Sequence, residues 1–107
     1  MTDPHLIGRT GERLAAAVLA RHGLTVVARN VAIGSGELDI LAMDGPRRVV
    51  VEVRTITGHH DPLDAYDPAK AAQVSRLAAR VGADRVDLMA IRLSREAAEL
   101  RWVRGAA

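Results

Sequence analysis

Two aliphatic segments joined by a short polar turn constrain the fold of this chain more than any other feature. The first runs from Gly34 to Met43 and the second from Val49 to Arg54. Runs of β-branched and aliphatic residues bounded by Gly, Ser, Asp and Pro are typical of β-strands. A turn over residues 44–47 then predicts an antiparallel hairpin in which Met43 pairs with Arg48.

Acidic residues interrupt the two predicted strands at facing positions. In the register set by the turn, Asp39 lies opposite Glu52 and Glu37 lies opposite Arg54. Directly opposed residues have Cβ atoms about 4.5–5.5 Å apart, where like charges are destabilising. At ~5 Å and an effective dielectric constant of ~20, two carboxylates repel by about 3 kcal/mol. We therefore expect a proton, an arginine or a divalent metal ion at this acid pair.

Composition excludes several classes of protein. The chain has no cysteine, which rules out disulfides and thiolate metal sites. Only 2% of its residues are aromatic, too few for a platform that stacks single-stranded bases. The apolar run Leu14–Ala20 is too short to span a bilayer. We expect one domain over residues 1–107, located in the cytoplasm without membrane contact.

The balance of charge gives a weaker indication. Fifteen basic residues exceed 13 acidic ones, and every basic residue except Lys70 is an arginine. Arginine suits phosphate recognition because its planar guanidinium binds oxyanions in a bidentate manner. An arginine-rich composition also reflects genome composition, and net charge alone is a weak argument for a nucleic-acid partner.

The other segments predict a mixed α/β domain. Helical spacing followed by glycine predicts helices over His5–Arg21 and Tyr66–Val81. Further strands are predicted at residues 24–31, 85–93 and 99–103. The resulting order α-β-β-β-α-β-β predicts a mixed central sheet flanked by helices.

The second predicted helix has an apolar side and a polar side. The apolar side is formed by Ala69, Ala72, Leu77 and Val81. Residues three apart share a helix face, which gives a polar side of Lys70, Gln73 and Arg76. This polar side is either a solvated edge or a strip that contacts backbone phosphates. The hairpin turn adds two more candidates for nucleic-acid contact, Arg47 and Arg48.

Three other polar features have an ordinary structural interpretation. Glu12 borders the apolar stripe of the first helix, as a boundary carboxylate or an intrahelical partner of a neighbouring arginine. Asp87 lies near the start of a strand and is expected to be a capping or surface residue. The adjacent His59 and His60 are expected in a mobile surface loop, since neighbours in sequence rarely bind one ion.

Three motifs together resemble a known family. The motifs are Gly11-Glu12, the segment Gly36-Glu37-Leu38-Asp39-Ile40-Leu41-Ala42, and Val51-Glu52-Val53-Arg54-Thr55. Over residues 8–93 the chain resembles the YraN-like family of uncharacterised bacterial proteins. That family is similar to the restriction-endonuclease-like, or PD-(D/E)XK, superfamily with its tRNA-endonuclease-like fold. Its acid pattern is also similar to that of archaeal Holliday-junction resolvases.

The resemblance implies a site for Mg²⁺ or Mn²⁺. Asp39 and Glu52 would be metal ligands, together with the carbonyl of Val53, and Glu12 would reach the metal directly or through water. Glu37 would be an accessory acid. Arg54 stands where the family usually has lysine. Arginine cannot act as a general base, so Arg54 would position water, stabilise charge on the phosphate, or pair with an acid and displace the metal.

Two functions follow as expectations. The first is a Mg²⁺-dependent nuclease for structured or double-stranded DNA, with Glu12, Asp39, Glu52 and Arg54 as its catalytic residues. The alternative is a non-catalytic nucleic-acid-binding module on the same fold, and a scaffold protein without nucleic acid is a third option. RNA as a partner and a homodimeric state are both left open.

Overall fold

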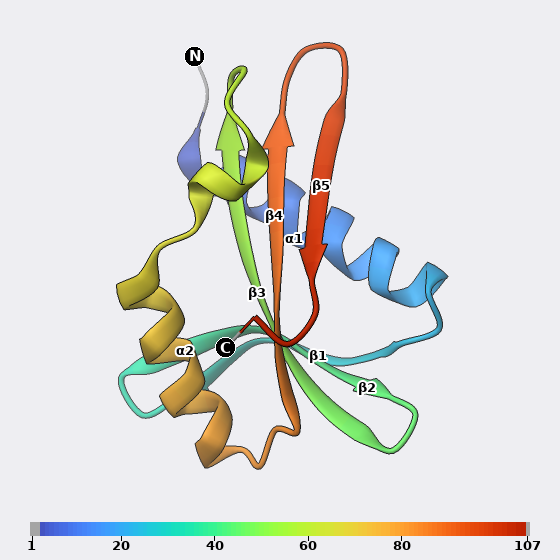
Figure 1. Cartoon of the computed structure of the whole chain (residues 1–107), viewed down its shortest axis with the longest axis vertical. Coiled ribbons are helices and arrows are strands. Elements are labelled where there is room, and N and C mark those ends of the chain that lie inside the picture. Colours follow the sequence, from blue (N-terminus) through green and yellow to red (C-terminus); the bar gives the residue numbers. More distant parts are fainter. Residues whose placement is uncertain (1–2, 107) are drawn as a thin grey trace.

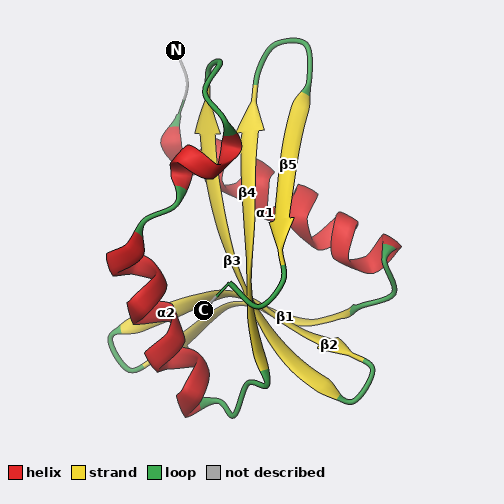
Figure 2. Cartoon of the chain, in the orientation of Figure 1, coloured by secondary structure: helices red, strands yellow, loops and turns green. Residues whose placement is uncertain are grey.

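The computed structural model describes residues 3–106, which form two α-helices, a 3₁₀ helix and one five-stranded sheet (Figures 1 and 2). The elements are α1 (Pro4–Arg21), β1 (Thr25–Ile33), β2 (Gly36–Asp44), β3 (Arg47–Thr57), η1 (Pro62–Ala65), α2 (Pro68–Arg80), β4 (Arg85–Leu93) and β5 (Ala98–Val103). The predicted order α-β-β-β-α-β-β and the mixed sheet are confirmed.

The strands lie in the order β1-β2-β3-β4-β5, and only β3 and β4 are parallel. A parallel pair needs a crossover, which η1 and α2 provide. The helices cover opposite faces of the sheet (Figure 1). Ala15 and Leu19 of α1 pack with Ile40, whereas Val74 and Leu77 of α2 pack with Val50.

The predicted register of the central hairpin is confirmed. Met43 pairs with Arg48, and a two-residue turn with Gly45 at a φ of 60° connects the strands. The ladder continues to Ile40–Val51 and ends there. The expected pairs Asp39–Glu52 and Glu37–Arg54 therefore lie beyond the ladder, where the two strands separate.

Helix α2 begins at Pro68, later than the predicted start at Tyr66. Asp67 is the cap, because its carboxylate accepts the N–H groups of Ala69 and Lys70. Proline suits the first helical position and disfavours a helical conformation in the residue before it. The predicted start at Tyr66 was therefore wrong, because Asp67 caps the helix and Pro68 is its first residue.

The buried side of α2 also differs from the prediction. It consists of Ala71, Val74, Leu77 and Ala78. Ala69 and Ala72, which were expected on the apolar side, are exposed. Alanine occurs on both sides of this helix, so only the larger Val and Leu side chains identify the buried face.

Asp87 contradicts its predicted surface location, because it is completely buried. Its carboxylate accepts hydrogen bonds from Arg85 Nε (2.8 Å), Trp102 Nε1 (3.0 Å) and the backbone N–H of Gly105 (2.9 Å). These donors come from β4, from β5 and from the segment after β5. Asp87 therefore ties the C-terminal segments to the sheet.

Helix α1 approaches β3 closely at Gly11. A Cβ atom at Gly11 would lie 1.9 Å from Oγ1 of Thr55, so only glycine fits at this contact. The next residue along the helix is Glu12, which is thereby held beside β3. Within residues 3–106, neither helix has the length and hydropathy needed to cross a bilayer.

Candidate functional site

Asp39 lies at an interruption of the sheet. The β2–β3 ladder runs from the hairpin turn to the pair Ile40–Val51, and Asp39 is the first residue of β2 beyond its end. Across from it on β1, Asn30 has a φ of 53°, in the left-handed region. The Asp39 carboxylate instead accepts the N–H of Val53 at 2.8 Å. A side chain therefore takes the place of a ladder contact and fixes the carboxylate between the separating strands.

Strand β2 also changes face at Asp39. Leu38 packs with the α2-side cluster, whereas Ile40 packs with the α1-side cluster. Regular alternation would put both residues on one face. The alternation of side chains along β2 is therefore interrupted at Asp39.

Glu52 is the most constrained acid of the site. It is 5% exposed, and within the described part of the chain its Oε1 atom is buried without a hydrogen-bond partner. Burial raises its pKa, and the charge of Asp39 raises it further, whereas Arg54 and Lys70 oppose the shift. An unpaired buried carboxylate oxygen is costly unless a cation or a proton compensates it.

Asp39 and Glu12 experience the same effect. Burial raises the pKa of Asp39, although the N–H of Val53 and the charge of Lys70 act in the opposite direction. Burial also raises the pKa of Glu12, and Asp39 adds to this increase. Glu12 interacts with Asp39 from α1, and Glu52 interacts with it from β3. Asp39 is therefore the acid that connects the other two.

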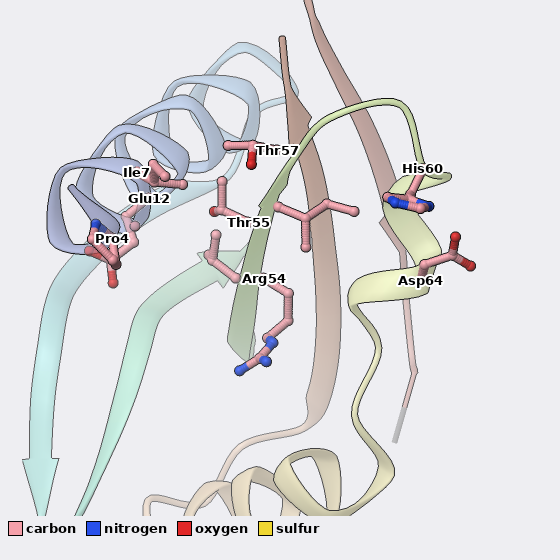
Figure 3. Close-up of a pocket in the computed structure, with 11 residues that line it drawn as sticks. Pro4, Ile7, Glu12, Arg54, Thr55, Thr57, His60 and Asp64 are labelled. Carbon is pink, nitrogen blue, oxygen red and sulfur yellow. The ribbon is translucent and has the colours of Figure 1, made fainter. Parts of the chain in front are cut away.

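A cleft of about 810 Å³ opens between the first half of α1, the end of β3 and η1. In Figure 3, Glu12 projects from α1 on one side, Arg54 from β3 in the middle, and His60 and Asp64 from the other side. Val53 also lines the cleft, and its N–H binds Asp39. Among residues 3–106, neither Asp39 nor Glu52 lines this cleft. The acid pair is connected to the cleft through strand β3, whose residues Val53 and Arg54 line it.

The Arg54 side chain is bound to η1. Its Nε donates to the carbonyl of Ala65 at 3.3 Å. The ion pairs formed among residues 3–106 do not include one between Arg54 and Asp39 or Glu37. The interpretation in which Arg54 folds onto an acid as a salt bridge therefore does not describe this structure.

The acids do not form a complete metal-binding cluster. Over the described residues, no three His, Asp or Glu side chains converge in an arrangement that would hold a metal ion. Glu37 is exposed. The candidate ligands that remain together are the carboxylates of Asp39 and Glu52 with the backbone of Val53.

The basic candidates occupy different environments. Arg47 and Arg76 are exposed, whereas Lys70 and Gln73 are half-buried. The Nη1 atom of Arg48 donates to the carbonyl of Val81 at 2.6 Å, so this guanidinium holds the hairpin against the end of α2. These residues therefore do not form one uniform strip.

Sequence reasoning placed Lys70 on that strip and missed its relation to the acids. Its charge lowers the pKa values of both Asp39 and Glu52. The available signal was its spacing, because Lys70 lies four residues before the buried Val74 and so shares its helix face.

The adjacent histidines face different spaces. His60 lines the large cleft, and His59 lines a neighbouring cleft of about 440 Å³. Both residues are exposed, in agreement with the expected surface loop.

Comparison with solved structures identifies the fold. Hjc from Archaeoglobus fulgidus, described as a Holliday junction resolvase from an archaeal hyperthermophile, superimposes with a TM-score of 0.59. The match covers 91% of this chain and 76% of that chain at 18% identity. This agreement confirms the restriction-endonuclease-like fold expected from the sequence.

Comparison of sequences identifies the family. The model of the uncharacterised protein family UPF0102 matches residues 11–91. A UPF0102 protein of Acidothermus cellulolyticus is 49% identical over 67% of this chain, which spans 56% of that relative. A UPF0102 protein of Arthrobacter sp. is 40% identical over 85% of this chain and 86% of its own length. The expected YraN-like resemblance is confirmed, and this chain belongs to the uncharacterised protein family UPF0102.

Proposed function

We propose that this protein is a Mg²⁺-dependent nuclease that hydrolyses phosphodiester bonds of structured or double-stranded DNA. In this proposal Asp39, Glu52 and the carbonyl of Val53 hold the metal ion. The fold supports the proposal, since Hjc, described as a Holliday junction resolvase, has the same architecture. The proposal concerns the domain of residues 1–107, which spans little more than half of the Acidothermus relative.

The observation that carries the proposal is the unpaired Oε1 atom of Glu52. Asp87, the other buried carboxylate among residues 3–106, has donors in Arg85 and Trp102. Glu52 has a second acid nearby, so this region repels further negative charge and attracts a cation. Hard divalent cations prefer carboxylate and carbonyl oxygens, which are the donors present here.

A divalent ion bound there would activate water near neutral pH and offset the charge that develops on the phosphate. The protein's own residues have separate tasks. The Val53 N–H fixes the Asp39 carboxylate in one orientation. Arg54 lines the cleft and carries a permanent positive charge, so it binds and orients a phosphate group without exchanging a proton. Glu12 lines the opposite wall, where it positions water near Asp39.

The test is cleavage of labelled branched, flapped and duplex DNA with Mg²⁺ or Mn²⁺. We expect the wild type to cut at least one of these substrates. Glu52→Gln and Asp39→Asn should reduce the rate by about 10²-fold or more, the loss typical of removing one essential electrostatic group. Glu96→Gln removes an exposed carboxylate from the β4–β5 turn and serves as the matched control. Cleavage that persists equally in both site variants would reject the proposal.

The presence of arginine at position 54 supports a second candidate function, in which the protein binds nucleic acid without cutting it. Its guanidinium is held by the carbonyl of Ala65 and cannot serve as a general base. A binder of this kind would show strongly salt-dependent affinity, because lysines and arginines release counterions from phosphates. Arg54→Lys distinguishes the two functions: cleavage should rise if the site is catalytic, and DNA affinity should stay nearly constant in a pure binder. Parallel assays with RNA of the same sequence test the other polymer.

A further inference from the structure

Helix α2 brings its first turn to the face of β3 that carries Glu52. Val74 and Leu77 of α2 pack with Val50 of β3. Lys70 precedes Val74 by four residues, which is one helical turn of about 5.4 Å on the same helix face. Glu52 follows Val50 by two residues, which is about 6.6 Å on the same strand face. The two steps are similar in length.

The two steps also point in the same direction. Figure 1 shows α2 with its first turn nearer the arrowhead of β3 than its last turn. The charge of Asp67, the cap of α2, acts on Glu52, which places the N-terminal end of the helix near that carboxylate. Lys70 lies one helical turn from Val74, and Glu52 lies two residues from Val50, in the same direction. Because Val74 packs with Val50, Lys70 and Glu52 are expected to lie near each other.

Lys70 is the only lysine in the chain, and it is half-buried. Its charge acts on both Asp39 and Glu52. Its effect on Asp39 exceeds that of Arg54, whereas Arg54 has the larger effect on Glu52. The guanidinium of Arg54 is meanwhile bound through Nε to Ala65. Both acids therefore receive positive charge from two sides, from Lys70 on α2 and from Arg54 on β3.

We propose that Lys70 is a second cationic residue of the acid-pair site, beside Arg54, and that its ammonium group binds the phosphate that is cut. This inference rests on the proposed nuclease function. An ammonium group on a four-carbon stem is a compact charge that can move between a carboxylate and a phosphate.

The test combines two measurements on Lys70→Ala. Removing a positive charge beside two carboxylates should tighten Mn²⁺ binding several-fold, measured by calorimetry or by the Mn²⁺ electron paramagnetic resonance signal. Removing a phosphate ligand should lower the rate of DNA cleavage by about 10²-fold or more. These changes have opposite signs, whereas a folding defect would weaken both. Arg80→Ala is the matched control, because it removes one charge from an exposed position in the last turn of α2.

The outcomes separate this inference from the function on which it rests. If the wild type cuts DNA and Lys70→Ala cuts equally well, the inference is wrong and the nuclease function stands. If Lys70→Ala binds Mn²⁺ with unchanged affinity, Lys70 is not part of the site. If the wild type neither binds Mn²⁺ nor cuts DNA, the proposed function fails and this inference fails with it. Tighter Mn²⁺ binding in Lys70→Ala alone supports the placement of the charge, even in a wild type that does not cut.

Discussion

Glu52→Gln should make the protein more stable at neutral pH. Glu52 is 5% exposed, and its Oε1 atom is buried without a partner among the described residues. Asp39 adds a second negative charge nearby. Glutamine has almost the same shape and removes the charge, so the substitution relieves both burial of the charge and repulsion while leaving the packing unchanged.

We expect the free energy of unfolding at pH 7 to rise by about 1–2 kcal/mol. An unsatisfied buried polar group costs about 1–3 kcal/mol, more if it is charged, and the neutral amide keeps part of that cost. For a domain of this size, 1 kcal/mol corresponds to a shift of roughly 4 °C or more in Tm. The cations Arg54 and Lys70 reduce the gain, because they already oppose the rise in the pKa of Glu52.

The gain should depend on pH in a defined direction. Glu52 has a folded-state pKa above its ordinary value of 4.5, so on raising the pH the unfolded chain loses this proton first. The stability contributed by protonated Glu52 is fully present below pH 4.5 and is lost as the pH rises through the folded-state pKa. The difference in Tm between Glu52→Gln and the wild type should therefore vanish near pH 4 and be largest near pH 7–8.

Differential scanning calorimetry between pH 4 and pH 8 measures this effect, with Glu96→Gln as the control. The exposed carboxylate of Glu96 should change Tm by no more than the scatter expected for surface substitutions. A Glu52→Gln variant that is less stable than the wild type at pH 7 would refute the reasoning. A gain in Tm that is the same at pH 4 and pH 7 would also refute it, because the charge would then not be the cause.

Three further predictions test the site and its supports. Mg²⁺ at about ten times its dissociation constant should stabilise the wild type by about 1.4 kcal/mol and leave Glu52→Gln unchanged, as thermal melts would show. Gly11→Ala should cost about 1–3 kcal/mol in urea unfolding, because its Cβ would lie 1.9 Å from Thr55 Oγ1. Gly8→Ala has nothing within 4 Å and should be neutral or stabilising; equal losses in both variants would contradict the contact. Asp87→Ala should cost about 3–5 kcal/mol, since it leaves its buried donors unpaired, and a loss under about 1 kcal/mol would contradict that role.

The hairpin at the centre of the sheet was predictable because its signals are local. The turn residues at Gly45 and the aliphatic segments on both sides set the register, and the pairing of Met43 with Arg48 followed. What local rules did not predict is the break at Asp39. At this break Asn30 of another strand has a left-handed conformation, and the Asp39 side chain contacts the backbone of Val53.

Long-range contacts also explain the errors outside the hairpin. Asp87 looks like a surface residue in sequence, since its donors Trp102 and Gly105 are more than a dozen positions away. The role of Lys70 depends on which side of α2 is buried, and the many alanines of that helix obscure this side. The order of the predicted helices and strands therefore gave the fold class, whereas the partners of single polar residues required the packed structure.

Two buried acids, Asp87 and Glu52, differ in whether the protein supplies hydrogen-bond donors to their carboxylates. Asp87 is fully buried and receives donors from Arg85, Trp102 and the backbone of Gly105, so its negative charge is compensated within the chain. Glu52 is nearly as buried, yet one of its oxygens has no donor in the described structure, and a second acid lies nearby. The same 107 residues thus include both a satisfied carboxylate and an unsatisfied one. Since an unsatisfied buried charge lowers stability, a purely structural role for Glu52 would be served better by glutamine or an apolar residue. The loss of stability at Glu52 is explained if a cation from solution neutralises the charge of Asp39 and Glu52. Binding of such a cation is the premise of the proposed nuclease site.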